Sequence, residues 1–305
     1  MDTILILDFG SQYTQLIARR VRELHVYSEI LPWDALPDRI RDIHPCGIIL
    51  SGGPSSVYEN DAPIIQPTIM QAGVPILGIC YGMQALTQIL GGQVIPAGER
   101  EFGPSQINVA KENPLIPFGN LDVWMSHGDR IDQIPGGFEI LASNPNCPFA
   151  AMGDVKRKIY GVQFHPEVRH TPQGKEILRR FVIDICQAPQ EWTPASMIDL
   201  AVERIQSQVG EARLLSAVSG GVDSSVATAL AARAVGTRLN AIFVDHGLLR
   251  KNERLFVEQA FLPIMEKRFI CVDATERFME GLQGVTDPET KRRIIGESFI
   301  RVFED

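Results

Sequence analysis

Cys80 lies midway between two glycines in residues 75–86, PILGICYGMQAL, where an apolar run changes into a helical pattern. A Gly-x-Cys-x-Gly turn between a strand and a helix has the form of a nucleophile elbow, whose sharp turn requires small residues on both sides. The following helix directs its amino terminus at the sulfur, and such an environment stabilises a thiolate. The alternative is a buried cysteine that serves as a small apolar residue, and the pentapeptide alone leaves both interpretations open.

A nucleophilic cysteine needs a base, and His165-Pro166-Glu167 provides a histidine and a carboxylate. Pro166 favours an extended backbone at His165, and residues two apart in an extended chain share a face. His165 and Glu167 can therefore point the same way. This permits a relay in which the histidine takes and returns a proton while the acid fixes its tautomer. A lone histidine is more often structural, but a carboxylate two residues away and the elbow cysteine weaken that interpretation.

Donors for an oxyanion are expected from the glycines of residues 51–54, SGGP, which follow the apolar run at residues 47–50. Backbone without side chains can present its N–H groups to a tetrahedral intermediate. We expect the amides of Gly53 and Tyr81 to form this pair. By itself, the SGGP segment would be interpreted as an ordinary glycine turn.

The elements that must position these residues follow from apolar runs at residues 3–7, 47–50 and 74–79, with helical patterns between them. This alternation predicts a parallel sheet with helices on its faces, and Ser11 is a candidate cap for the first helix. From residue 93 to 162 the pattern changes to shorter segments, at residues 106–110, 121–125, 138–142 and 159–162, which predict hairpins. A closing helix at residues 174–186 ends the first predicted domain, residues 1–187.

A second α/β domain is predicted at residues 195–305, after a linker at residues 188–194. Strand runs at 214–218, 241–244 and 269–272 alternate with helices that begin near Ser224 and Asn252. The chain ends inside a helical pattern after only three strands, and α/β sheets usually have more. We therefore expect this second domain to be truncated.

A second glycine-rich loop, Ser219-Gly220-Gly221-Val222-Asp223-Ser224-Ser225, lies between the strand run at 214–218 and an alanine-rich helix. Glycines, hydroxyls and a helix amino terminus together form an anion cradle. Asp223 would repel phosphates unless a divalent cation bridges them, so its presence favours Mg²⁺. The alternative is a capped helix in which Asp223 or Ser224 satisfies the first turn.

Composition narrows the class of ligand. The net charge of -8 and the pI near 5.4 disfavour nucleic acid and anionic lipid and favour small-molecule substrates. The amino terminus lacks the cationic start of a signal peptide, and no apolar run is long enough for a membrane span. Five scattered cysteines without a Cys-x-x-Cys pair predict neither a disulfide framework nor a zinc site, which suits a reducing cytoplasm.

Four segments in this order resemble the triad-type class I glutamine amidotransferases: residues 8–12 (DFGSQ), 51–54 (SGGP), 78–84 (GICYGMQ) and 165–167 (HPE). The resemblance covers about residues 1–187 and implies a flavodoxin-like fold with a mixed, mostly parallel sheet. It further implies that Cys80, His165 and Glu167 hydrolyse glutamine through a thioester. Gln84 and the Gly53 backbone would hold the glutamine. The loop of residues 126–129, with Ser126, His127 and Gly128, would contact its amino-acid end, and His127 would be a structural or gating residue rather than a second base.

The loop at residues 219–225 resembles that of the ATP pyrophosphatases, which cleave ATP between the α and β phosphates and adenylate a second substrate. That resemblance implies a parallel-sheet, adenine-nucleotide-hydrolase-like fold and places Val244 beside the adenine. The two halves together resemble the family of glutamine-hydrolysing GMP synthases. The resemblance includes Trp192-Thr193-Pro194 at the junction and residues 287–296 near the end. This implies that ammonia aminates adenylated XMP to give GMP, AMP and pyrophosphate. Members of that family are homodimers, and we expect their dimerisation domain to be absent here.

Two other enzyme classes fit these residues less well, and one non-catalytic alternative remains open. An NAD synthetase shares the ATP loop, but its glutamine domain is of a different, nitrilase-like type. A CTP synthase shares the glutaminase, but its synthetase module lacks the loop at residues 219–225. A non-catalytic protein that binds glutamine, nucleotide or an intact partner is compatible with the same residues.

Overall fold

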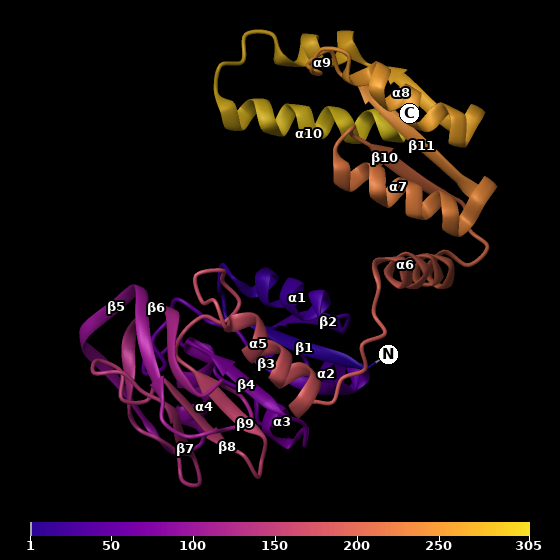
Figure 1. Ribbon diagram of the computed structural model, residues 1–305. Helices are drawn as coiled ribbons and strands as arrows, with labels where there is room; N and C mark the ends of the chain where they lie inside the picture. The colour runs from indigo at the N-terminus through magenta and orange to yellow at the C-terminus, as the bar shows by residue number, and fades with distance from the viewer. Residues whose placement is uncertain (1) are drawn as a thin grey trace. The chain divides into compact units, whose positions relative to one another are not determined.

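The computed structural model describes residues 2–305, apart from the side chains of Glu99, Pro194 and Ser196. The chain divides into two compact units, one ending at Thr193 and the other beginning at Pro194 (Figure 1). Residues 188–193 belong to the first unit. The Trp192 N–H donates to the carbonyl oxygen of His25 at 2.8 Å, and Gln190 Nε2 donates to that of Leu24 at 3.1 Å.

A seven-stranded sheet in the order β2-β1-β3-β4-β9-β8-β7 forms the first unit. The first five strands of that order are parallel, β8 pairs antiparallel with β9, and β7 pairs antiparallel with β8, which confirms the predicted mixed, mostly parallel α/β sheet. The strands are β1 (Thr3–Asp8), β2 (Tyr27–Pro32), β3 (Pro45–Leu50), β4 (Ile76–Ile79), β7 (Glu139–Ala142), β8 (Ala151–Asp154) and β9 (Ile159–Val162). The β2 and β8 strands were not among those expected from the sequence.

Helices cover both faces of this sheet. Alternate residues of β1 enter opposite cores, because Ile4 and Ile6 pack with α1 and α5 while Leu5 and Leu7 pack with α2, α3 and α4. The helices are α1 (Thr14–Glu23), α2 (Pro37–Ile43), α3 (Pro67–Gln71), α4 (Tyr81–Ile89) and α5 (Gly174–Arg179), which continues as the π-helix η1 (Arg180–Ile185).

The expected cap of α1 is wrong, because the residue that precedes the helix is Tyr13 and no side chain caps it. The Ser11 hydroxyl instead accepts the N–H of Tyr13 at 3.0 Å, outside the helix. Ser11 therefore shapes the turn between β1 and α1.

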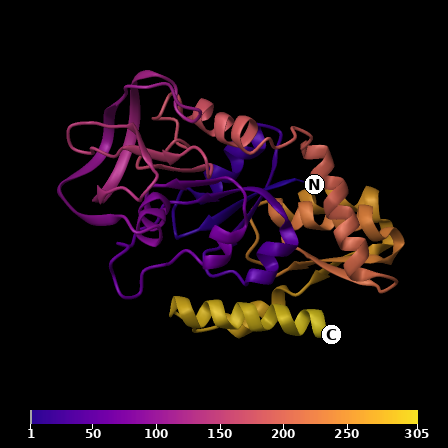
Figure 2. The same ribbon diagram turned by 90° about the horizontal axis from the view of Figure 1, so that it is seen from below.

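A long hairpin of β5 (Gln93–Val109) and β6 (Gly119–Gln133) lies to one side of the first unit in both views (Figures 1 and 2). The predicted segments at residues 106–110 and 121–125 are only its distal half. Inward-facing residues alternate along β6, where Leu121, Val123 and Met125 are buried. The other end of β6 carries residues 126–129 to the carboxyl edge of the sheet.

Three parallel strands in the order β10-β11-β12 form the sheet of the second unit: β10 (Leu214–Val218), β11 (Leu239–Asp245) and β12 (Phe269–Asp273). The helices are α6 (Pro194–Val209), α7 (Val222–Val235), α8 (Glu253–Met265), α9 (Thr275–Leu282) and α10 (Pro288–Glu304), with the 3₁₀ turns η2 (Gly236–Arg238) and η3 (Glu266–Arg268). The core contains Leu239, Phe243 and Met265. Within residues 2–305, no helix is both long and apolar enough to span a membrane.

Candidate active site

The carboxyl ends of four neighbouring parallel strands, β1, β3, β4 and β9, meet at one edge of the sheet and position the candidate residues. Cys80 follows β4 and precedes α4 with φ 52° and ψ -108°, a left-handed backbone that a non-glycine residue rarely adopts. Its N–H donates to the carbonyl oxygen of Val162 in β9 at 2.8 Å. This strained turn is the geometry of a nucleophile elbow, in which the side chain stands above the sheet edge.

The two glycines that flank Cys80 allow the close packing of this turn. A methyl group on Gly78 would lie 2.6 Å from the carbonyl carbon of Gly82, and one on Gly82 would lie 2.5 Å from the carbonyl oxygen of Leu50. Both distances are too short for any side chain. The glycines of Gly-x-Cys-x-Gly are therefore required because α4 packs too closely against β3 and β4 to leave room for side chains at residues 78 and 82.

We expect Gly82→Ala to destabilise the first unit by about 1–3 kcal/mol, because the added methyl forces α4 away from β3. The free energy of unfolding, measured by urea titration, checks this. Gly136→Ala is the matched control, because its added methyl meets open space. Equal stability of Gly82→Ala and the control would contradict the packing argument.

His165 and Glu167 point toward each other, with Nδ1 of the ring 2.8 Å from Oε1 of the carboxylate. Both side chains are buried. Hydrogen bonds from outside the motif hold its backbone: the His165 N–H donates to Trp124 O at 3.0 Å, Thr171 Oγ1 donates to His165 O at 2.7 Å, and Arg20 Nε donates to Glu167 O at 3.0 Å. The orientation of the His165 ring is therefore fixed by Glu167, and the backbone that carries the ring is fixed by hydrogen bonds to other segments.

The charge of His165 depends on these neighbours. Burial of the ring on its own lowers the pKa, yet hydrogen bonds to Cys80 and Glu167, together with the carboxylate charge, outweigh it and raise the pKa of His165 to about 10. An imidazolium therefore persists at neutral pH. A protonated ring at this position can give a proton to a leaving group.

Cys80 and His165 line the same cavity of about 210 Å³, together with Gly53, Ser126 and residues 10–13. A methyl group on Gly52 would lie 3.2 Å from Cε1 of His165 and 3.7 Å from Cβ of Cys80, so both side chains converge on this glycine. The ring of Tyr13 meets the His165 ring edge-on, with centroids 5.2 Å apart.

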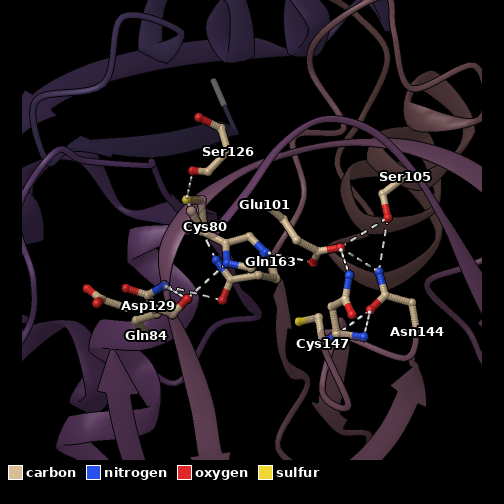
Figure 3. Close-up of polar contacts among 11 residues, drawn as sticks. Cys80, Gln84, Glu101, Ser105, Ser126, Asp129, Asn144, Cys147 and Gln163 are labelled. Carbon is tan, nitrogen blue, oxygen red and sulfur yellow. Dashed lines mark hydrogen bonds and ion pairs between the residues drawn. The ribbon is translucent and has the colours of Figure 1, made fainter. Parts of the chain in front are cut away.

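A second cavity, of about 540 Å³, also reaches Cys80, Gly53 and Ser126. Its lining includes the other residues predicted to bind glutamine and the oxyanion, namely Tyr81, Gln84, His127 and Gly128. The structure thus brings the predicted residues of the first unit together around the thiol. Figure 3 shows Cys80 Sγ directed at the main chain of Ser126, whose carbonyl oxygen is 3.5 Å away.

The amides of Gly53 and Tyr81 have no hydrogen-bond partner among residues 2–305. The neighbouring amides are paired: the N–H of Cys80 donates to Val162 O, and the N–H of Gly82 donates to Ser51 O at 3.1 Å. Two free donors therefore belong to residues that line the cavity of about 540 Å³ together with Cys80.

Gln163 is a site residue that sequence reasoning missed. Its Nε2 donates to Cys80 Sγ at 3.7 Å, and its Oε1 accepts from Gln84 Nε2 at 3.3 Å. Gln84 Nε2 also donates to Asp129 O at 3.3 Å. The sequence did contain a signal for Gln163, because residues two apart in an extended chain share a face, and Gln163 lies two residues before His165.

Asp129 is the last residue of the loop at 126–129 that was expected to contact glutamine. Its carboxylate accepts hydrogen bonds from Ser56 Oγ at 2.5 Å and from Tyr58 Oη at 2.7 Å, which joins β6 to the loop after β3. His127 Nδ1 lies 3.0 Å from Asp129 O, and Nε2 faces Glu101. Burial lowers the pKa of His127, although Glu101 and the Asp129 carbonyl oppose that effect.

The predicted phosphate loop of the second unit forms a compact turn before α7. Ser224 Oγ accepts from the Ser219 N–H at 3.1 Å and donates to Gly221 O at 3.1 Å, while Gly220 has a φ of 81°. The expected start of this helix at Ser224 is wrong, because α7 begins at Val222. Val222, Asp223, Ser224 and Ser225 therefore form its first turn, where backbone N–H groups are unpaired.

The exposed carboxylate of Asp223 lies in this first turn. Mg²⁺ is usually held by one or two carboxylates plus substrate phosphates, so a single exposed carboxylate at a helix amino terminus fits that ion. A cavity of about 260 Å³ beside the loop is lined by Ser219, Val244 and aromatic side chains of α10. Its apolar walls suit a flat base.

Comparisons with known proteins agree with this geometry. The family model described as glutamine amidotransferase class-I matches residues 5–185. Curated relatives include the GMP synthases [glutamine-hydrolyzing] of Thermomicrobium roseum, 50% identical over 307 residues, and of Staphylococcus saprophyticus, 53% identical over 307 residues. Each alignment covers 100% of this chain but only 58% and 60% of the relative, so the chain spans about three fifths of their length.

A solved structure from Thermoplasma acidophilum, provisionally described as one component of a GMP synthase, is 32% identical with a TM-score of 0.55. The match covers 66% of this chain and 97% of that one. The family model covers more than half of the 305 residues and includes the elbow and the His-Pro-Glu segment. The chain belongs to the class-I glutamine amidotransferase family.

Proposed function

We propose that the first unit hydrolyses glutamine to glutamate and ammonia, and that the ammonia aminates XMP in a reaction coupled to ATP cleavage in the second unit. The observation that carries the first half is the buried His165, bonded to Glu167 and converging with Cys80 on one cavity. In this proposal the three side chains act as a catalytic triad.

Cys80 Sγ attacks the side-chain amide carbon of glutamine and forms a tetrahedral intermediate. His165 gives a proton to the leaving nitrogen, the C–N bond breaks, and ammonia departs from a γ-glutamyl thioester. His165 then takes a proton from water, whose oxygen attacks the thioester, and the returned proton restores Cys80 as glutamate leaves. Glu167 keeps the ring oriented through Nδ1 during both steps.

The amides of Gly53 and Tyr81 stabilise the negative oxygen of both tetrahedral intermediates, since two free N–H groups of residues that line the same cavity as Cys80 suit this role. Gln84, Ser126, His127 and Gly128 hold the substrate from the larger cavity. The side chain of Gln84 also donates to Gln163 Oε1 and Asp129 O, which fixes its orientation in the cavity wall.

In the second unit, residues 219–225 and Val244 bind ATP, with phosphates at the first turn of α7 and the base in the cavity beside Val244. Asp223 would hold Mg²⁺, which supplies charge neutralisation for the phosphates. An oxygen of XMP attacks the α phosphate, pyrophosphate leaves, and ammonia then displaces AMP to give GMP. The names of the curated relatives support this choice of product.

We assign the glutaminase reaction to residues 1–187 and the ATP pyrophosphatase reaction to residues 195–305. Residues 188–194 connect the two segments. By the same family resemblance, the protein would act as a homodimer. Five free cysteines suit a reducing cytoplasm, where we place the reaction.

Glutamate release by the purified chain, with and without Mg-ATP plus XMP, tests the proposal. Release that rises with the nucleotides supports both halves. Release that ignores them supports the glutaminase and contradicts coupling to the second unit, while absence of release contradicts the whole proposal.

We expect Asp223→Asn to weaken Mg-ATP binding at least about tenfold, because loss of a charged contact costs about 1.5–3 kcal/mol. Glutamine hydrolysis without nucleotide should not change. Isothermal titration with Mg-ATP checks the affinity, and Glu211→Gln, another exposed carboxylate of the second unit, is the control. An unchanged affinity for Asp223→Asn would remove its metal role.

A further inference from the structure

Three metal-ligating side chains converge behind the wall of the larger cavity. Glu101 of β5, His127 of β6 and Cys147, which follows β7, place a carboxylate oxygen, an imidazole nitrogen and a sulfur all within 4.8 Å of one another. His127 is 4% exposed, Cys147 is 1% exposed, and the Glu101 side chain is 11% exposed. The glutaminase chemistry proposed above uses neither Glu101 nor Cys147.

The tautomer of His127 follows from its neighbours. Asp129 O, 3.0 Å from Nδ1, is a carbonyl oxygen that can only accept, so Nδ1 carries the proton. Nε2 then presents a lone pair toward Glu101 Oε2, 3.3 Å away. Neither atom has a hydrogen-bond partner in the described chain, because their mutual geometry does not meet that of a hydrogen bond. Two buried acceptors that face each other are unfavourable unless a proton or a metal ion lies between them.

Surrounding hydrogen bonds hold the Glu101 carboxylate in this orientation. Its Oε1 accepts from Ser105 Oγ, Asn144 Nδ2 and Asn146 Nδ2 at 3.3–3.4 Å, which directs Oε2 at the histidine. Asn144 also fixes the third ligand, because its Oδ1 accepts the N–H of Cys147. Figure 3 shows Ser105 and Asn144 on one side of Glu101, with Cys147 close by. Such outer partners orient the ligands of protein metal sites.

We propose that Glu101, His127 and Cys147 bind a Zn²⁺ ion. The donor set selects the metal, because a sulfur and an imidazole nitrogen with a single carboxylate suit zinc and disfavour Mg²⁺ and Ca²⁺. Three protein ligands leave one tetrahedral position for water or another ligand. The thiol of Cys147 loses its proton to solvent when the sulfur coordinates.

The ion would connect to the candidate active site through two main-chain groups. Asp129 O accepts from both His127 Nδ1 and Gln84 Nε2, and Ser126 O is the neighbour of the Cys80 thiol. Zinc at His127 would therefore hold β6 where it forms the cavity wall. His127 itself lines the cavity of about 540 Å³, which provides a path for the ion.

Co²⁺ titration of the full chain tests the site by absorption spectroscopy. A Cys80→Ala background is needed, because the Cys80 thiol is a competing ligand. We expect a sulfur-to-cobalt charge-transfer band in Cys80→Ala that Zn²⁺ abolishes by displacement. The band should disappear in Cys80→Ala/Cys147→Ser and persist in Cys80→Ala/Cys271→Ser, which removes a thiol of the second unit.

Zn²⁺ affinity gives an independent measurement. In the Cys80→Ala background we expect Ser105→Ala, which removes one partner of Glu101 Oε1, to weaken Zn²⁺ binding about tenfold. Zn²⁺ should also raise the melting temperature of Cys80→Ala but not of the Cys147→Ser double variant, provided circular dichroism shows both folded. A cobalt band that survives loss of Cys147, or the absence of any band in Cys80→Ala, would overturn the proposal.

Discussion

Replacement of Cys80 by alanine should slow glutamate release from glutamine on the order of 10⁶-fold, the loss that follows removal of the nucleophile from a catalytic triad. The sulfur is the only protein atom of the proposed mechanism that forms a covalent bond with the substrate. Alanine fits the space of the thiol, and the elbow depends on the glycines at 78 and 82, so the fold should persist.

A coupled assay for glutamate measures the loss, and circular dichroism checks the fold of Cys80→Ala. Cys46→Ser is the control, since this half-buried thiol donates to Thr3 O at the far end of β1. Glutamate release that continues in folded Cys80→Ala would remove Cys80 as the nucleophile.

Replacement of Glu167 by glutamine should reduce the rate about 10²-fold or more, the range of a lost general acid–base contribution. A glutamine amide can donate to Nδ1, which leaves the single proton of a neutral ring on Nε2, so that Nε2 cannot accept the thiol proton. The substitution also removes the carboxylate that raises the pKa of His165, so this pKa should fall below about 10. Titration of the His165 ring by nuclear magnetic resonance reports that change.

The same substitution should alter the pH dependence of stability. Because the folded-state pKa of His165 is raised, the protonated ring stabilises the fold fully below about pH 6.5, and that stabilisation is lost as pH rises toward about 10. Glu167→Gln should therefore lose less stability than the parent chain across this window. Glu176→Gln, at a partly buried ion pair with Arg179, is the control and should keep the slope of the parent. Identical slopes in all three proteins would contradict the raised pKa.

The site was predictable where chemistry depends on local spacing. The elbow at Cys80 is encoded by two glycines that meet backbone atoms of their own turn and of Leu50, and the pair His165 and Glu167 by an extended step of two residues. Strand ends of a parallel sheet meet at one edge, so the order of apolar runs was enough to bring Gly53 beside Cys80.

The rest depends on long-range contacts that local patterns do not carry. Gln163 reaches the thiol across 83 residues of chain, and Asp129 reaches Tyr58 across 71. The cluster of Glu101, His127 and Cys147 has no ligand spacing to recognise, because each side chain comes from a different segment of the first unit. The β2 strand escaped prediction because Ser28 and Glu29 interrupt its apolar pattern.

Covalent labelling tests the central claim most directly. An analogue of glutamine that carries an electrophilic carbon in place of the amide should alkylate the sulfur that attacks the substrate, and peptide mass spectrometry identifies the modified residue. We predict a single label on Cys80, prevented by excess glutamine and absent from Cys80→Ala. A label that resists glutamine, or that lies on one of the other four cysteines, would contradict the assignment of Cys80 as the nucleophile.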